Sequence, residues 1–344
     1  MNVVRIANIL LTRRCNLRCE YCNLVKDYPN MPDCYRSIKQ YADEELYPSQ
    51  WIDIIERLVA NNPDVFLILY GGEPFLYPGL KDVVKFCNES NVSYTIISNN
   101  TPIARTRAYE IFSALGPFKG FTSSVDPVAL MSDEELGVLS KSAKDIVEKS
   151  RLGLENLAKM KKDGISEDVV AEITVTNMSL PFLYDTILQL TNNGVWSSIT
   201  VVDDKKSDYY DFSSVEDQSQ MLTKSDAESI FLRIKEDAEA GILKVHIPSL
   251  LPRLLDILPS CMKCSIRNDL HNVTIDADGT MRLCLRIRGE RCPDILAKTA
   301  FSKNGQVNKL LKKAIKRDYD KVCLGCNWTC PLMSDEFADS VIDH

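Results

Sequence analysis

The chain of 344 residues is long enough for one large α/β domain or two smaller ones, and its 45% hydrophobic and 26% charged residues exclude a disordered, collagen-like or membrane-spanning class. A net charge of -7 argues against nucleic acid as the main partner, because binding phosphate requires clustered Lys and Arg. Twelve cysteines without a signal peptide favour a cytoplasmic protein with metal sites rather than disulfides, and only three histidines make sulfur the main ligand.

Six short β-rich runs alternate with helical patterns from residue 5 to about residue 204. The runs are I-A-N-I-L-L-T, V-F-L-I-L-Y, V-S-Y-T-I-I-S, F-T-S-S-V-D, V-A-E-I-T-V-T and S-I-T-V-V-D. Apolar residues recur between them at helical spacing, as in Trp51, Ile54, Ile55, Leu58 and Val59, or in Leu80, Val83, Val84 and Cys87. This alternation predicts parallel strands with right-handed crossovers, in an open doubly wound sheet or, as we expect, a partial (β/α)6 barrel.

Polar or reactive residues follow the first five predicted strands. They are Cys15, Gly71 to Pro74, Ser98 to Asn100, Asp126 and Asn177. Because the carboxyl ends of parallel strands meet at one face of a barrel, we expect the functional site there.

The chain divides into three expected parts. Residues 1–204 form the barrel, residues 205–260 form a connecting or substrate-facing segment, and residues 261–344 form a small cysteine-rich domain. In the middle segment, the capping box S-D-A-E at Ser225 to Glu228 predicts the start of a helix.

The stretch T-R-R-C-N-L-R-C-E-Y-C-N places Cys15, Cys19 and Cys22 in one loop. An iron-sulfur cube normally takes one thiolate per iron, so three cysteines leave the fourth iron open to a substrate or cofactor. The basic residues nearby suit negatively charged thiolates, and they are Arg13, Arg14, Arg18 and Lys26. The alternative is a zinc or redox C-x-x-C site with an incidental third thiol.

C-N-L-R-C-E-Y-C, followed after a helix and a strand by G-G-E-P, resembles the signature of radical S-adenosylmethionine (SAM) enzymes. The resemblance implies that Cys15, Cys19 and Cys22 hold a 4Fe-4S cluster whose open iron chelates the methionine part of SAM. A low-potential electron, expected from a flavodoxin or ferredoxin type of donor, then splits SAM to a 5'-deoxyadenosyl radical. That radical abstracts hydrogen from a substrate C–H bond.

The resemblance also implies roles for the residues at the strand ends. Tyr21 would lie against adenine, Gly71 and Gly72 would permit close backbone approach, and Glu73, followed by Pro74, would accept hydrogen bonds from the methionine ammonium. The cofactor-binding residues implied near the ribose and at the equivalent strand ends are Ser124, Asp126, Ser98, Asn99 and Asn177. Simple strand termination by turn-forming residues is the alternative for these last positions.

The carboxyl-terminal spacing of Cys264, Gly279 and Cys284 is similar to the opening of the auxiliary-cluster extension called twitch, or SPASM in its longer form. D-A-D-G predicts a hairpin turn between V-T-I-D and M-R-L-C-L. We expect one auxiliary 4Fe-4S cluster, and its ligands would be Cys264, Cys284, Cys323 and Cys326, with Cys261 and Cys330 as possible substitutes. Tetrahedral zinc is the alternative.

We expect an enzyme of the oxidoreductase type that oxidises or cross-links a peptide or a small molecule. Because the cysteine loop begins at residue 15, we expect no amino-terminal peptide-recognition domain, which weakens the expectation of a peptide without excluding it. A thiol hydrogen donor such as Cys34 or Cys292 would permit epimerisation of a sugar or nucleoside instead. A non-catalytic zinc or iron-sulfur protein is the alternative of another class.

Overall fold

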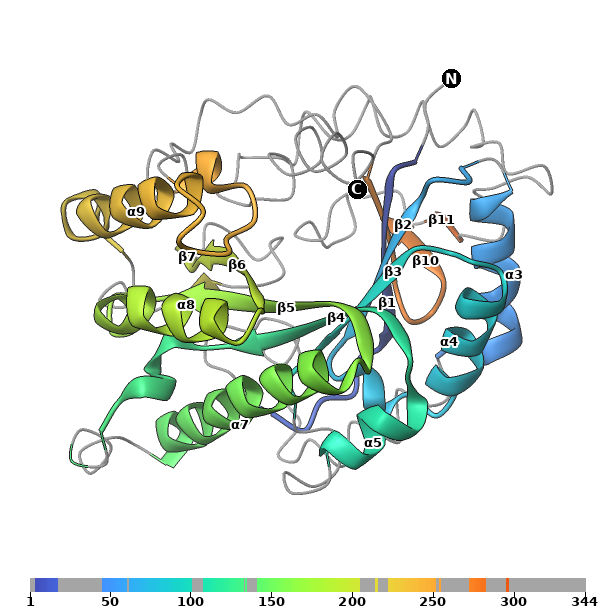
Figure 1. Ribbon diagram of the computed structural model, residues 1–344. Coiled ribbons are helices and arrows are strands. Elements are labelled where there is room, and N and C mark those ends of the chain that lie inside the picture. The colour runs from blue at the N-terminus through green and yellow to red at the C-terminus, as the bar shows by residue number, and fades with distance from the viewer. Residues whose placement is uncertain are drawn as a thin grey trace.

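The chain is described by a computed structural model at residues 4–17, 45–60, 62–100, 108–132, 134, 141–204, 214–215, 222–251, 254, 272–282 and 295–296. Its main element is a curled sheet that forms a partial barrel (Figure 1). The six predicted strands run parallel and side by side in chain order. They are β1 (Ile6–Thr12), β2 (Phe66–Gly71), β3 (Tyr94–Ser98), β4 (Phe118–Val125), β5 (Ser166–Val175) and β6 (Trp196–Val201). The predicted fold class is confirmed.

A hairpin from the carboxyl-terminal region extends this sheet beyond β1. β9 (Asn272–Ile275) pairs with β1 in parallel, and β10 (Thr280–Arg282) returns antiparallel to β9. The predicted turn between them is confirmed, since Gly279 has a φ of +83° and its N–H donates to the carbonyl oxygen of Asp276 at 2.8 Å. β11 (Ile295–Leu296) continues the sheet, while β7 (Asp203–Asp204) and β8 (Ser214–Val215) pair separately.

Helices of the described residues lie along the outside of the curled sheet (Figure 1). They are α3 (Pro48–Val59), α4 (Leu80–Glu89), α5 (Ala108–Leu115), α7 (Lys141–Asp163) and α8 (Leu183–Asn192). Both predicted apolar stripes are buried against the sheet, and Cys87 is a core thiol with no exposed surface, as expected. No helix in the described part of the chain combines the length and apolar character needed to cross a membrane.

Short 3-10 turns follow several strands, and two of them begin in the same way. η1 (Pro74–Leu76) and η3 (Pro127–Leu130) each open with a proline that follows an acidic residue. Proline suits the first helical position because its fixed φ is already helical and its missing N–H is not needed there. Further 3-10 turns in the described part of the chain are η4 (Leu180–Phe182) and η6 (Pro248–Leu250).

The start of α9 (Lys224–Glu239) differs from the prediction. The N-cap is Thr223, whose hydroxyl accepts a hydrogen bond from the N–H of Asp226, so the capping box expected at Ser225 to Glu228 is wrong by two residues. T-K-S-D has the same three-residue offset between a hydroxyl and an acidic residue, and it begins earlier. The expected division at residues 204 and 260 stays a prediction.

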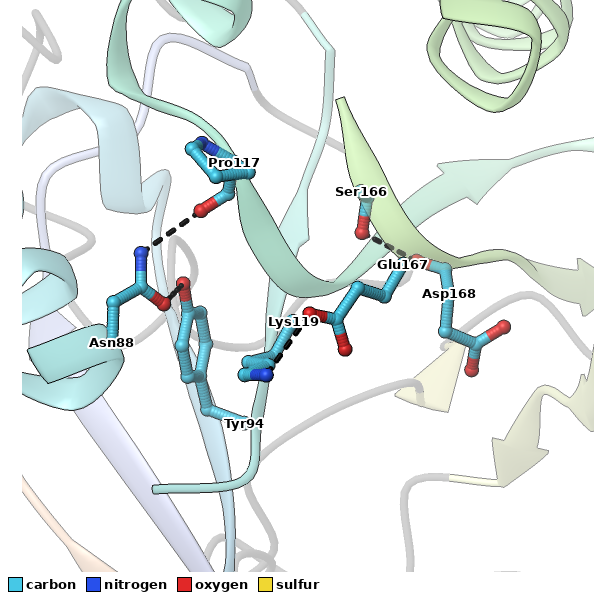
Figure 2. A network of polar contacts seen from close by, with 7 residues as sticks. All are labelled: Asn88, Tyr94, Pro117, Lys119, Ser166, Glu167 and Asp168. Atoms are coloured by element: carbon cyan, nitrogen blue, oxygen red, sulfur yellow. Dashed lines mark hydrogen bonds and ion pairs between the residues drawn. The ribbon is translucent and has the colours of Figure 1, made fainter. Parts of the chain in front are cut away.

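A polar network joins the strands at their amino ends (Figure 2). Asn88 of α4 donates to the carbonyl oxygen of Pro117 at 2.9 Å and accepts from the hydroxyl of Tyr94 at 2.9 Å. Beside it, Lys119 of β4 forms an ion pair with Glu167 of β5, also at 2.9 Å. These contacts tie α4, β3, β4 and β5 together at the face opposite the expected site.

Candidate active site at the carboxyl ends of the strands

The predicted strand-end residues lie where the sequence places them, at the last residue of β1 to β5 or within three residues after it. Hydrogen bonds join three of these positions, Cys15, Glu73 and Asn99. Asn177 is exposed after β5. Asp126 caps η3 after β4. The site therefore has a tightly connected part at the ends of β1, β2 and β3.

Glu73 accepts several of the hydrogen bonds at the ends of β1, β2 and β3, and its side chain has no exposed surface. One carboxylate oxygen accepts from the N–H of Phe75 at 3.2 Å and from the hydroxyl of Ser98 at 3.0 Å. The other accepts from the N–H of Asn99 at 2.7 Å. A carboxylate has about four acceptor positions, so one remains for a further donor.

Burial raises the pKa of Glu73 to about 7, although its three hydrogen bonds and the positive charge of Lys149 favour the ionised form. Asp126, which is 4% exposed, behaves in the same way, since burial raises its pKa to about 6 against the attraction of Lys149. Perturbed carboxyl groups of this kind are typical of functional sites. Lys149 was not predicted to belong to the site, because a single basic residue within α7 has no distinctive pattern.

The two glycines of the G-G-E-P turn are required by the end of β1. A Cβ on Gly71 would lie 2.2 Å from the carbonyl oxygen of Thr12, and one on Gly72 would lie 2.2 Å from that of Arg14. Both positions therefore permit close backbone approach, as predicted, but the approaching backbone belongs to the chain itself. Phe75 secures the other side of the turn by packing its ring 4.7 Å from the ring of Phe112.

Cys15 is half-buried at the rim, and its sulfur faces N–H donors. The backbone N–H of Leu17 lies 3.4 Å from the sulfur, and the side-chain amide of Asn99 lies 3.7 Å from it. Hydrogen bonds of this kind stabilise a thiolate and tune an iron-sulfur cluster that it ligates. The surroundings of Cys15 therefore fit a metal-bound thiolate.

The basic residues before Cys15 are paired with carboxylates. Arg13 forms a two-point ion pair with Asp276 of the β9–β10 turn. Arg14 lies 2.8 Å from the carboxylate of Glu45, which also accepts a hydrogen bond from the hydroxyl of Thr12. The sequence pattern placed these arginines near the cysteines but could not identify their partners, which come from distant parts of the chain.

Ser124 lies beside Glu172, a residue that was not predicted to belong to the site. Ser124 of β4 is in register with Glu172 of β5, and both are half-buried. Burial raises the pKa of Glu172, while hydrogen bonds from Ser198 and Thr200 lower it. The available signal was the acidic residue inside the otherwise apolar run V-A-E-I-T-V-T.

Several predicted site residues lie outside the described residues. They are Cys19, Tyr21, Cys22, Cys34, Cys261, Cys264, Cys284, Cys292, Cys323, Cys326 and Cys330. The described cysteines, Cys15 and Cys87, are thiols rather than disulfides. Within the described ranges, no group of three His, Cys, Asp or Glu side chains is placed to hold a metal ion.

Comparisons with known proteins agree with this arrangement. The family model described as the Radical SAM superfamily matches residues 9–178. The structure of SuiB from Streptococcus suis bound to S-adenosylmethionine is similar with a TM-score of 0.63 and 13% identity, covering 92% of this chain and 68% of that chain. The structure of SuiB bound to its precursor peptide SuiA gives a TM-score of 0.61 at 13% identity, with 92% and 67% covered.

A third structure, anSMEcpe with bound AdoMet, has a TM-score of 0.50 and 15% identity, covering 94% of this chain and 89% of that chain. A sequence comparison with curated proteins finds no match. At these identities the solved structures support the fold alone. The family match extends from β1 past the end of β5 and includes the cysteine loop and the G-G-E-P turn, so residues 9–178 form a domain of the radical SAM superfamily.

Proposed function

We propose that this chain cleaves SAM reductively at the carboxyl ends of its strands and abstracts hydrogen from a C–H bond of its substrate. The observation that carries the proposal is the position of Asn99. Its side-chain amide points to the sulfur of Cys15, and its backbone N–H donates to the buried carboxylate of Glu73. One residue thus joins the first expected cluster ligand to the expected methionine-binding turn.

Cys15, Cys19 and Cys22 would hold the 4Fe-4S cluster. When bound, the cluster and SAM would supply a 5'-deoxyadenosyl radical, given one electron from a low-potential donor. The N–H groups near Cys15 fit the negative charge of a ligating sulfur, and Tyr21 would lie against adenine.

Glu73 would orient the methionine part of SAM with its remaining acceptor position. A bound ammonium beside this carboxylate would favour its ionised form and lower its pKa from about 7. Ser124 and Asp126 would contact the ribose. Asn177, which is exposed after β5, would bind the cofactor from the end of that strand.

We propose a peptide as the substrate and its oxidation or cross-linking as the reaction. The similar SuiB structure is described with its precursor peptide SuiA, which supports this choice. A small molecule that is epimerised or dehydrogenated is the second candidate. An auxiliary 4Fe-4S cluster on Cys264, Cys284, Cys323 and Cys326 would accept the electron released by oxidation, and the observed β9–β10 hairpin before Cys284 supports that part of the proposal.

The test is anaerobic incubation of the iron-loaded protein with SAM and dithionite, followed by quantification of 5'-deoxyadenosine. The wild-type protein should form it, and Cys15→Ala, Cys19→Ala and Cys22→Ala should each abolish it. Cys87→Ala is the matched control, because that thiol is buried in the core at the inner side of α4. A wild-type protein that forms no product, or a Cys15→Ala variant that forms as much, would refute the proposal.

A further inference from the structure

The backbone that leads from β1 to Cys15 is held on its β2 side by two hydrogen bonds. The N–H of Gly72 donates to the carbonyl oxygen of Thr12 at 2.8 Å. The N–H of Glu73 donates to the carbonyl oxygen of Arg14 at 2.7 Å. Side chains also hold this segment, since Glu45 accepts hydrogen bonds from the hydroxyl of Thr12 and from the backbone N–H of Arg13.

The side chain of Arg13 contacts the carboxyl-terminal hairpin. Its Nε lies 3.0 Å from one carboxylate oxygen of Asp276, and a terminal nitrogen bonds the second oxygen. The side chains are only 12% and 3% exposed. A buried, two-point Arg–Asp pair has a fixed geometry, and removing one partner leaves an uncompensated charge. The pair therefore holds Arg13 more firmly than a surface ion pair would.

Asp276 is itself fixed by the hairpin turn. The N–H of Ala277 donates to its side chain at 2.7 Å, and the N–H of Gly279 donates to its carbonyl oxygen at 2.8 Å. Four parallel register pairs, from Ile6 with Asn272 to Ile9 with Ile275, hold β9 beside β1 (Figure 1). The hairpin thus offers a rigid acceptor to Arg13.

Arg13 stands two residues before Cys15, at most about 7–8 Å along the backbone. The Cys15 sulfur accepts hydrogen bonds from the backbone N–H of Leu17 at 3.4 Å and from the side-chain amide of Asn99 at 3.7 Å, which are ordinary distances for sulfur. These contacts orient the thiol. The position of the Cys15 backbone depends in addition on the residues before it, and hence on the partners of residues 12–14.

We propose that Asp276, acting through Arg13, is a positioning residue for Cys15. The β9–β10 hairpin would then help to fix the position of the Cys15 thiol. The inference rests on the proposed function, in which Cys15 is a cluster ligand. It deepens that function by assigning a role in the amino-terminal site to a residue that lies more than 260 positions later in the chain.

The first test uses metal-free, reduced protein and follows alkylation of individual cysteines by iodoacetamide with mass spectrometry. At about pH 9, more than half of an ordinary exposed thiol is ionised, so the labelling rate reports mainly its exposure. Asp276→Ala is compared with wild type and with Glu167→Ala, which removes the Lys119–Glu167 pair at the amino ends. Cys87, fully buried, serves in each sample as the internal reporter of global unfolding.

Asp276→Ala should label Cys15 about tenfold faster than wild type, with Cys87 still protected and Glu167→Ala unchanged. If Cys87 also becomes labelled, Asp276→Asn, which keeps the shape of the side chain, takes the place of Asp276→Ala. The exchanged pair Arg13→Asp with Asp276→Arg should restore slow labelling. If Cys15 is labelled within about twofold of the wild-type rate in both Asp276→Ala and Asp276→Asn, the proposal is overturned.

The second readout is the part of the EPR signal of the reduced protein that changes when SAM is added, measured per chain after reconstitution with iron and sulfide. Asp276→Asn should lower this SAM-dependent part several-fold, and Glu167→Ala should leave it unchanged. A wild-type protein without any cluster would refute the proposed function, while the labelling of metal-free protein would still decide whether Asp276 positions Cys15. An unchanged signal in Asp276→Asn would overturn the positioning role.

Discussion

The two ends of the barrel use acidic side chains in opposite ways. At the amino ends, Glu167 is 67% exposed and pairs with Lys119, which is 33% exposed (Figure 2). At the carboxyl ends, Glu73, Asp126 and Asp276 are at most 4% exposed. Burying a carboxyl group costs free energy unless donors and charges compensate it. The amino end therefore resembles an ordinary protein surface, whereas the carboxyl end holds carboxyl groups whose burial costs free energy.

The pKa values of two of these buried carboxyl groups follow from their burial. Burial raises the pKa of Glu73 to about 7 and that of Asp126 to about 6, although Lys149 attracts both charges. Carboxyl groups with a raised pKa suit a site that binds a charged ligand, because their protonation changes when a charge binds beside them. This burial supports the proposal that the site lies at the carboxyl ends of the strands, where parallel barrels generally carry their function.

The largest effect should come from Gly72→Ala. A Cβ there would lie 2.2 Å from the backbone oxygen of Arg14, and backbone cannot yield as a flexible side chain does. We expect a loss of about 3–5 kcal/mol in the free energy of unfolding, measured with urea, or failure to fold. Gly164→Ala is the control, because its φ is +65° but nothing lies within 4 Å, and it should cost about 1 kcal/mol. Equal losses would contradict the account.

Breaking one ion pair at each end should give the next largest difference. Asp276→Ala leaves Arg13 largely buried without its partner and should lower the free energy of unfolding by about 2–4 kcal/mol. Glu167→Ala removes a solvent-exposed pair and should cost at most about 1 kcal/mol. Urea titrations of both variants at the same pH measure the difference. Similar costs would show that the two ends do not differ.

The pH dependence of stability tests the burial of Glu73. Its pKa is about 7 in the folded protein against a reference value of 4.5, so the folded state holds the extra proton between these values. Stability from this group is therefore greatest at low pH and falls as the pH rises through 7. Glu73→Gln lacks this titration. The unfolding free energy of wild type minus that of the variant should fall by about 2–3 kcal/mol from pH 5 to 8.

Metal-free protein is required for that measurement, because a bound ligand would change the titration. A difference between wild type and Glu73→Gln that stays constant with pH would show that the carboxylate is already ionised in the folded protein.

A smaller effect should come from Asn88 in the amino-end network. Asn88→Ala removes the hydrogen bonds to Tyr94 and Pro117 and should cost about 1–2 kcal/mol in unfolding free energy. It should leave the formation of 5'-deoxyadenosine per folded chain unchanged. A large loss of that activity would mean that the amino end takes part in function.

The strands and their order followed from the sequence, because each buried run is short, apolar and β-branched, and each connecting helix carries a clear stripe. I-A-N-I-L-L-T matches β1 at both ends. The D-A-D-G hairpin was also predicted, but not its place beside β1. Strand pairing between residues 6–9 and 272–275 is a tertiary contact, and no local pattern encodes it.

The site shows the same division between local and long-range information. The strand-end positions of Cys15, Glu73 and Asn99 were predictable, since they follow from strand lengths and the motif. The partners of Arg13 and the charge of Lys149 near the buried carboxyl groups were not. These depend on how distant segments pack, which propensity and spacing do not determine.

The central claim is that three cysteines near the amino terminus hold a cluster with one open position, which SAM fills. EPR spectroscopy of the dithionite-reduced, anaerobically reconstituted protein tests it most directly. The account predicts a cluster signal whose shape changes when SAM is added, and loss of that change in Cys15→Ala, Cys19→Ala and Cys22→Ala. A signal that is indifferent to SAM, or a change that survives in all three variants, would contradict it.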